Sequence, residues 1–360
     1  MTYIQQQQSY DNDEEESGGT LFGDGTLSSV KSDITSTLIQ SVWGVSSEYS
    51  MMGLVGINLD NEGQLSIDSD KLEGYLKTNF NDVRNLFAAN GSTNAGTLEY
   101  VLHSRDTEAG EYTVNITTAA TQSTSTSNNG TVGENETLTI IDGDKVAEVV
   151  LTTDMTFSGI KNAINWEMSK VYMDITATDD GSGHLVLTHD NYGSEHSFTI
   201  SEDAATPGNK LWTGGDQTVN NGVDVAGTIN GEAATGSGQI LKGNEGESNI
   251  EGLAIKYTGT AEGLDVGEIK LTLGTAALFD RVLFSITDSY EGYIAFKQNF
   301  LRNSIDSFET RIEEMEARLD LKMENMINKF VAMESALSVM QSQSQWLTGQ
   351  INASYSGWGW

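Results

Sequence analysis

Three of the four histidines in this chain lie close together. They are His184, His189 and His196 in the stretch "GHLVLTHDNYGSEHSFTI", which also holds Asp190 and Glu195. Imidazole nitrogens and carboxylate oxygens bind metal ions, so a hairpin here would bring two histidines together as a candidate metal site. The spacing fixes no complete set of ligands. We therefore interpret the three histidines as exposed residues of turns and strand ends, and we expect no metal.

A second stretch, "LDNEGQLSIDSDK", has alternating oxygen-bearing side chains from Asp60 onward, as a calcium loop does. An EF-hand loop needs glycine at its sixth position and glutamate at its twelfth, and here these positions are Leu65 and Lys71. The stretch is therefore predicted to be a hairpin turn. The acidic pairs that begin at Asp142 and Asp179 are also interpreted as turns, because Asp and Gly are common turn residues.

The sequence contains no recognisable catalytic constellation. Carboxylate pairs arise by chance in a chain with 52 Asp and Glu residues, so such pairs do not identify an acid and a base. The glycine-rich run "ATGSGQ" near Gly236 lies among strand patterns and lacks the lysine of a phosphate-binding loop. The absence of cysteine removes thiol nucleophiles and disulfides. We expect a protein that is not an enzyme and has no cofactor.

Charge and hydropathy narrow the range of partners. The formal net charge of -33 would repel nucleic acid and anionic membrane surfaces. No apolar run approaches the roughly 18 residues of a membrane-spanning helix, and no basic segment followed by an apolar one opens the chain. We therefore expect neither nucleic acid nor a membrane as a partner.

The elements that would position any functional residue fall into a helical and a β-rich group, so the expected fold class is α+β. A β-rich insert is predicted to lie on a small mixed α/β domain, which is followed by a long C-terminal coiled-coil helix. The predicted divisions are a flexible acidic arm (1–19), the small domain (20–97 with 275–300), the β-rich insert (98–274), the helix (301–350) and a tail (351–360).

Within the small domain, Leu27, Val30, Ile34 and Leu38 recur at helical spacing, with Asp24 or Thr26 available as the N-cap. A hairpin over 57–67 and two short helices over 70–78 and 81–87 are predicted to follow. In the insert, short alternating segments predict strands. A helix over 157–169 is predicted to face the core with Ile160, Ile164 and Met168, and residues 119–135 are predicted to form a loop.

From Asp280 to Leu347 the pattern predicts one uninterrupted helix with a narrow apolar stripe. Its residues alternate steps of four and three, which is the heptad pattern of a coiled coil. Two consecutive steps of four, at Leu319 and Met323, form a stutter. The stripe, called the seam below, consists of Leu301, Ile305, Phe308, Ile312, Met315, Leu319, Met323, Met326, Phe330, Met333, Leu337, Met340 and Leu347.

The segment "RIEEMEARLDLKMENMINKFVAMESALSVMQSQSQWLTGQ" closely resembles the C-terminal helix of the flagellar filament-capping family, also called hook-associated protein 2. The stretches "GTLFGDGTLSSVKSDI", "GINLDNEGQLSIDSDKLEGYL" and "LFDRVLFSITDSYEGYIAFKQNFL" resemble conserved segments of the same family. A further stretch, "GVDVAGTINGEAATGSGQILKGNEGESNIEGLAIKYTGT", is similar to an insert motif that flagellins and their caps share.

The resemblance implies a structural cap at the tip of the bacterial flagellum, needed for filament elongation because it helps exported flagellin to fold and insert. It implies a ring-like homo-oligomer, described most often as a pentamer. The implied partners are flagellin, the hook-filament junction protein and a flagellar export chaperone. The implied location is extracellular, at the flagellar tip, after secretion through the flagellar channel. The chain resembles the C-terminal portion of the family, whose seam pairs with an N-terminal helix outside these 360 residues.

Two alternatives remain open at this level. The chain could be a flagellin-like filament protein or a surface adhesin, in which the insert does the work and the helix only assembles. More remotely, the insert could be a glycan-binding or calcium-binding β module.

Overall fold

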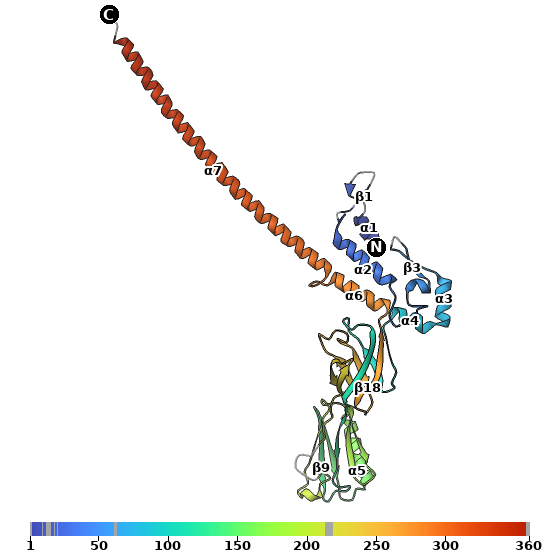
Figure 1. Cartoon of the computed structure of the whole chain (residues 1–360). Helices are drawn as coiled ribbons and strands as arrows, with labels where there is room; N and C mark the ends of the chain where they lie inside the picture. The colour runs from blue at the N-terminus through green and yellow to red at the C-terminus, as the bar shows by residue number, and fades with distance from the viewer. Residues whose placement is uncertain are drawn as a thin grey trace. The chain divides into compact units, whose positions relative to one another are not determined.

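The computed structural model describes residues 2–8, 10–11, 16–17, 19, 21–60, 63–212 and 219–357 of the chain. The chain contains both helices and strands, with most strands between residues 90 and 272 and the long helix α7 after them (Figure 1), which confirms the predicted α+β class. The chain divides into two compact units, Met1–Leu283 and Phe284–Trp360. The first unit contains three separate hydrophobic clusters, so it is stabilised by three cores and not by a single one.

The N-terminal segment contains regular structure. Helix α1 (Thr2–Gln8) is followed by two short antiparallel strands, β1 (Tyr10–Asp11) and β2 (Glu16–Ser17). The described part of the predicted flexible acidic arm over residues 1–19 thus contains regular secondary structure, and the flexibility of the arm stays a prediction. The remaining residues of the arm lie outside the described ranges.

The helices and the hairpin predicted over residues 25–87 are present, whereas strand β5 (Asn90–Thr93), which was predicted to lie in the small mixed domain, belongs to the eight-stranded sheet. The Asp24 carboxylate accepts hydrogen bonds from the amides of Thr26 and Leu27, which fixes the start of the first helix. Val55 and Leu86 are fully buried in its core. Its elements are α2 (Gly25–Ile39), η1 (Met52–Val55), β3 (Ile57–Leu59), β4 (Leu65–Ile67), α3 (Ser69–Thr78) and α4 (Phe80–Phe87).

An eight-stranded antiparallel sheet forms the first of two β lobes, with strand order β5-β18-β7-β14-β15-β16-β17-β6. Its two end strands contact each other: the Thr93 hydroxyl of β5 donates to the Leu98 carbonyl of β6 over 2.9 Å. The sheet therefore curls round the fully buried side chains of Val114, Leu241 and Ile269. The strands are β5 (Asn90–Thr93), β6 (Leu98–Leu102), β7 (Gly110–Thr118), β14 (Ala226–Ile229), β15 (Glu232–Ser237), β16 (Ile240–Gly243), β17 (Ala254–Tyr257) and β18 (Gly263–Thr272).

The second β lobe is inserted between β7 and β14 and has a hydrophobic core of its own. Two three-stranded sheets, of order β10-β9-β13 and β11-β12-β8, are packed with α5 (Phe157–Lys170). Ile160, Ile164 and Met168 are the buried residues of α5, as its 3.6-residue period predicts. The other elements are β8 (Gln122–Thr126), β9 (Glu136–Asp142), β10 (Lys145–Leu151), β11 (Ile175–Asp179), β12 (Leu185–Tyr192), β13 (Thr199–Glu202) and η2 (Pro207–Asn209).

The predicted loop over 119–135 is wrong, because β8 runs through it as an edge of the β11-β12-β8 sheet. Its run of serine and threonine resembles a low-complexity loop in composition, but Ser123 and Ser125 are buried. The Ser123 hydroxyl accepts a hydrogen bond from the Gly222 amide and donates one to the His196 carbonyl. Hydrogen bonds to residues distant in the chain therefore stabilise this strand. Its polar side chains gave no sign in the sequence that some of them would be buried.

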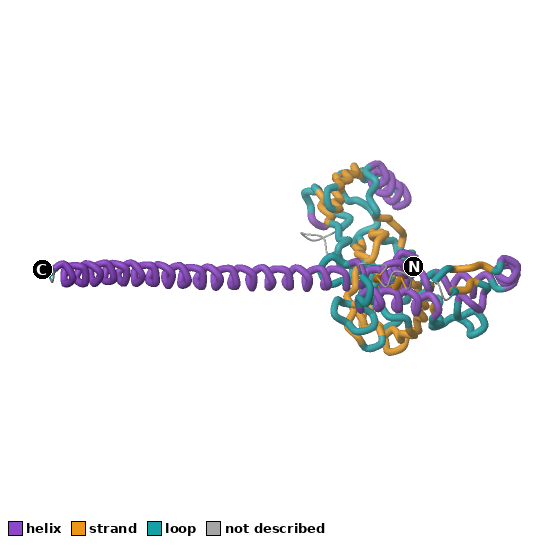
Figure 2. Tube along the Cα trace, turned by 90° about the horizontal axis from the view of Figure 1, so that it is seen from above, coloured by secondary structure: helices purple, strands orange, loops and turns teal. Residues whose placement is uncertain are grey.

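The C-terminal helical region consists of α6 (Thr275–Thr287) and α7 (Tyr293–Ser356). The uninterrupted helix predicted from Asp280 is therefore wrong. Between the two helices the Asp288 carboxylate accepts hydrogen bonds from the amides of Tyr290 and Glu291, which competes with helical hydrogen bonding. The helix continues to Ser356, so a tail beginning at residue 351 is also wrong (Figure 2).

Because the second β lobe has its own core, a cavity there should weaken that lobe selectively. Ile164→Ala removes a fully buried side chain and should lower the free energy of unfolding of this lobe by about 2–5 kcal/mol. Hydrogen exchange of the full chain in denaturant, read strand by strand, measures the effect. Asn162→Ala, on the exposed side of the same helix, is the control and should change stability by less than about 0.5 kcal/mol. An equal loss of protection in the eight-stranded sheet would contradict the conclusion that the second β lobe has a separate core.

Candidate assembly surface

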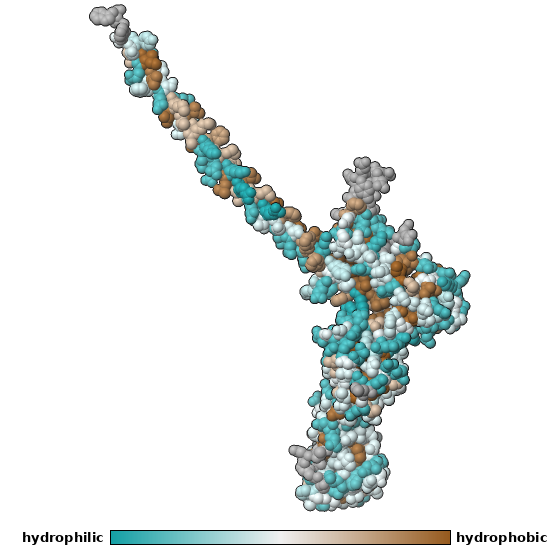
Figure 3. All heavy atoms as spheres, viewed as in Figure 1, coloured by the Kyte–Doolittle hydropathy of each residue, from teal (hydrophilic) through white to brown (hydrophobic). Residues whose placement is uncertain are grey.

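Helix α7 presents a long apolar stripe that is exposed. It has 64 residues and therefore a length of roughly 95 Å, and none of its residues is buried. A helix of a globular domain normally covers a core with its apolar stripe. Here the stripe is uncovered, and in Figure 3 apolar residues are visible along much of the helix.

All thirteen residues of the seam lie on α7, and all of them are exposed. Phe330 at 62% and Met333 at 52% exposure are typical of the set. At about 100° per residue, the seam positions stay on one side of the helix, and the stutter after Leu319 keeps them there in place of the drift that a strict heptad repeat would produce. That these residues form a coiled-coil contact stays a prediction.

Two residues extend the seam beyond the predicted set. Ile294 precedes Leu301 by seven residues and Ile351 follows Leu347 by four, so both continue its spacing. Both are exposed on α7, at 43% and 49%. The heptad spacing alone identifies both residues.

The charge of α7 differs from that of the rest of the chain. The helix carries six basic and eight acidic residues, a net charge of -2, whereas the whole chain carries -33. No charged residue follows Glu334 in the sequence. Copies of this helix can therefore approach each other with little of the repulsion that the rest of the surface produces.

The three clustered histidines do not form a metal centre. The rings of His189 and His196 stack with their centroids 5.0 Å apart, whereas His184 hydrogen-bonds to the Asp180 carboxylate over 3.1 Å. In the described part of the chain, no group of three His, Asp or Glu side chains is arranged to hold a metal ion. The interpretation of three exposed histidines is wrong, because His189 is 2% exposed and His184 and His196 are half-buried.

The candidate calcium loop is a hairpin turn, as predicted, between β3 and β4. The Asp60 carboxylate accepts a hydrogen bond of 2.7 Å from the Gln64 amide, and the Gly63 amide donates to the Asp60 carbonyl. Its aspartate is therefore used to close the turn. Residues 61 and 62 lie outside the described residues.

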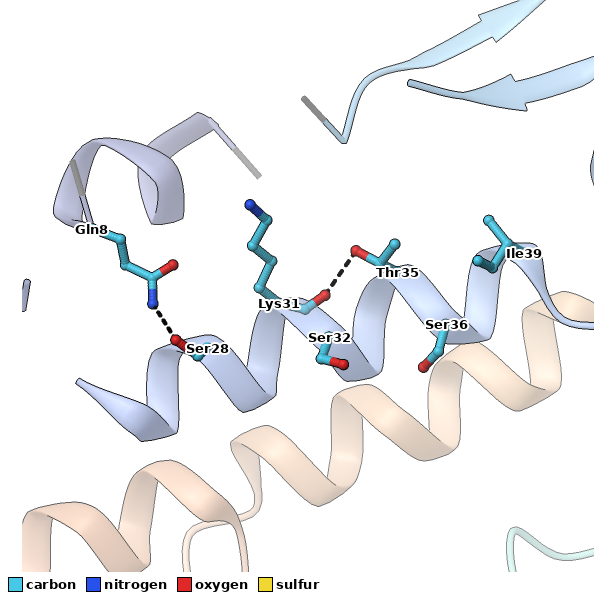
Figure 4. Close-up of a pocket in the computed structure, with 7 residues that line it drawn as sticks. All are labelled: Gln8, Ser28, Lys31, Ser32, Thr35, Ser36 and Ile39. Atoms are coloured by element: carbon cyan, nitrogen blue, oxygen red, sulfur yellow. Dashed lines mark hydrogen bonds between the residues drawn. The ribbon is translucent and has the colours of Figure 1, made fainter. Parts of the chain in front are cut away.

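A shallow groove of about 510 Å³ lies beside α2 and is shown in Figure 4. The side chain of Gln8 donates a hydrogen bond to the hydroxyl of Ser28 across it, and Thr35 donates to the Lys31 carbonyl of its own helix. Lys31 is the ionisable residue among those that line the groove, so these residues supply no pair for general acid and base catalysis. The lining residues are Gln8, Ser28, Lys31, Ser32, Thr35, Ser36 and Ile39.

No helix among the described residues is long and apolar enough to cross a membrane. The length, exposure and near-neutral charge of α7 are typical of a helix whose apolar seam packs on a second helix.

Comparison with known proteins shows what this chain is similar to. Residues 1–141 match the family model described as "Flagellar hook-associated protein 2 C-terminus". The flagellar hook-associated protein 2 of Aeromonas caviae is 32% identical over 90 residues, which are 24% of this chain and 19% of that protein. The matched segment thus spans about a fifth of the relative's length. These matches confirm the resemblance inferred from the sequence. The helix motif over 311–347 lies outside the range of the family model.

Solved structures give weaker similarities. The D2-D3 domains of the flagellar cap protein FliD from Escherichia coli align with a TM-score of 0.38 and 18% identity, covering 51% of this chain and 98% of that one. The corresponding protein of Bdellovibrio bacteriovorus aligns with a TM-score of 0.31 and 12% identity, covering 51% of this chain and 99% of that one. Scores this low carry no argument about the fold.

The exposed seam predicts association that depends on concentration. Leu337→Lys places a charge in the seam and should raise the dissociation constant for self-association by about tenfold or more, because a buried lysine would lose its hydration. Sedimentation equilibrium and helical circular dichroism over a range of concentrations measure this effect.

The matched control is Ser342→Lys, which adds the same charge about 140° round the helix from Leu337. Both variants should leave the unfolding of residues 21–283 unchanged, because neither position is buried. Equal loss of association in both variants would show that charge, and not the seam, controls assembly.

Proposed function

We propose that this chain forms part of a structural cap at the distal tip of the bacterial flagellar filament. The cap supports filament elongation by promoting the folding and insertion of exported flagellin. The match of residues 1–141 to the C-terminal family model carries the proposal. The exposed seam of α7 supports it physically, because a cap subunit needs a surface that becomes covered only in the assembly.

The role of α7 in this proposal is that of a leg between the cap and the filament. A rigid helix of roughly 95 Å carries its seam far from the β lobes without needing a core of its own. An uncovered apolar stripe costs free energy in water, so docking on a second helix is favourable. We propose a ring-like homo-oligomer, with a pentamer as the family resemblance implies, and with the seam covered by partner helices.

Further partners follow from the same proposal. Flagellin and the hook-filament junction protein are the filament components that the legs would contact, and a flagellar export chaperone would cover the seam before assembly. The chain is proposed to reach the flagellar tip outside the cell through the flagellar channel. It would work through contacts and not through catalysis.

Elongation requires legs that release and dock again as each subunit is added. Methionine suits such contacts, because its flexible side chain packs in several arrangements of similar energy. Five of the thirteen seam residues are methionine, at positions 315, 323, 326, 333 and 340. We propose that these residues keep each docking contact weak enough to break.

The proposed function predicts the outcome of gene removal. Bacteria that lack the coding region of this chain should export flagellin into the medium and form few filaments or none, since unfolded subunits would leave without inserting. Electron microscopy and assay of flagellin in the medium measure the result. Re-expression of the chain should restore filaments. Normal filaments without the gene would contradict the proposal.

Replacing the five seam methionines by leucine should strengthen docking and slow filament growth. Leucine has a similar volume but fewer rotatable bonds, so it favours fewer packing arrangements. Filament length against time, measured by fluorescent labelling, should show slower growth. Met51→Leu, outside α7, is the control, and filaments should grow at the normal rate in bacteria that carry it. Normal growth of the fivefold variant would contradict the proposed role of the methionines.

A further inference from the structure

Two carboxyl side chains lie within the second β lobe, where neither forms an ion pair with a described residue that would account for its burial. Glu136 begins β9 and is 4% exposed. Neither of its carboxylate oxygens makes a hydrogen bond of ordinary geometry with a described residue. An ionised carboxylate that is buried without a well-aligned donor is costly, so this side chain is expected to hold or share a proton.

The second carboxyl group belongs to Glu202 at the end of β13. In the antiparallel pairing of the two strands Glu202 lies opposite Leu138, so Glu136 is its diagonal neighbour on the same face of the sheet. The Glu202 carboxylate accepts hydrogen bonds from the Trp212 amide over 3.3 and 3.2 Å. The two carboxyl groups are thus held side by side at one end of the β10-β9-β13 sheet.

Other charged groups face this pair without neutralising it. Lys210 packs against it from the segment after η2, but its ammonium group donates to the backbone carbonyl of Glu202. Asp203 adds a further negative charge near Glu136. Burial, followed by the charge of Glu136, raises the pKa of Glu202 from its ordinary value of 4.5 to about 7. Burial also raises the pKa of Glu136. The backbone amide of Leu211 and the positive charge of Lys210 act in the opposite direction and lower it.

We propose that Glu136 and Glu202 share one proton and act as a pH-sensitive clamp, which holds β9 and β13 together in mildly acidic solution and loosens them at neutral and alkaline pH. When one carboxyl group is protonated, it donates a hydrogen bond to the other. When that proton leaves, two negative charges remain side by side in a core that holds Leu138 and Trp212.

The direction of the pH effect follows from proton binding. Between about pH 4.5 and 7 the folded lobe holds a proton that the unfolded chain has released, so the free energy of unfolding falls as the pH rises through this range. Above about pH 7 the pair has lost its proton in both states, and its contribution no longer changes. The overall negative charge of the chain has an effect of the same sign, so a control for charge is needed.

Hydrogen exchange of the full chain, corrected for the intrinsic rate at each pH, tests the clamp. Protection of β9 and β13 should fall by about fiftyfold between pH 5 and pH 8, and protection of the eight-stranded sheet should fall much less. Glu202→Gln should abolish most of this pH dependence, because the amide donates to Glu136 at every pH. Glu136→Gln provides a second test if the first variant folds poorly.

The matched control is Glu148→Gln, which removes the same charge from an exposed position of β10. In this variant the protection of β9 and β13 should depend on pH as fully as in the wild-type chain. The proposal is overturned if both buried variants lose protection with pH as the wild-type chain does, or if the control flattens the profile equally. Because the test reads only the second β lobe, its result is independent of the proposed role in the flagellum.

Discussion

The constraint on which this structure depends is the apolar stripe of α7, whose residues are all exposed. An isolated helix in water gains little from intrinsic propensity, and most helices in proteins are stabilised by packing of one face. Over its 64 residues α7 has no buried side chain, and we propose that a helix outside these 360 residues supplies that stabilisation. The near-neutral charge of α7 in a chain of net charge -33 is consistent with this requirement, because helices that meet must not repel.

The first unit shows the opposite arrangement, in which each part covers its own apolar surface. Core residues such as Val55, Ile164 and Leu241 belong to three separate clusters, and the second β lobe is inserted between β7 and β14. An insertion of this kind leaves the eight-stranded sheet complete, since β7 and β14 pair directly. The lobes can therefore vary or loosen separately while α7 keeps its own surface, and the buried pair of Glu136 and Glu202 would give one lobe its own response to pH.

Patterns of apolar residues predicted the elements whose burial they control. The spacing of Ile160, Ile164 and Met168 predicted the buried face of α5, and of the two N-cap candidates, Asp24 and Thr26, the structure uses Asp24 at the start of α2. The seam was visible because its period extends over many turns. The elements that sequence missed depend on contacts distant in the chain. In strand β8 the buried Ser123 forms hydrogen bonds with residues 73 and 99 positions away, and no local pattern shows such partners. The break before α7 is made by hydrogen bonds to Asp288, a residue type that helices also contain.

Accessibility of the seam on assembled flagella tests the central claim most directly. The chain has no cysteine, so Met326→Cys in the seam and Glu324→Cys on the opposite side of α7 each supply a single thiol. In the separated chain both thiols should react with a maleimide at similar rates, since both positions are exposed. On purified flagella the thiol at 326 should react at least tenfold more slowly, while the thiol at 324 changes less. Equal reactivity of the two thiols on flagella would contradict the account.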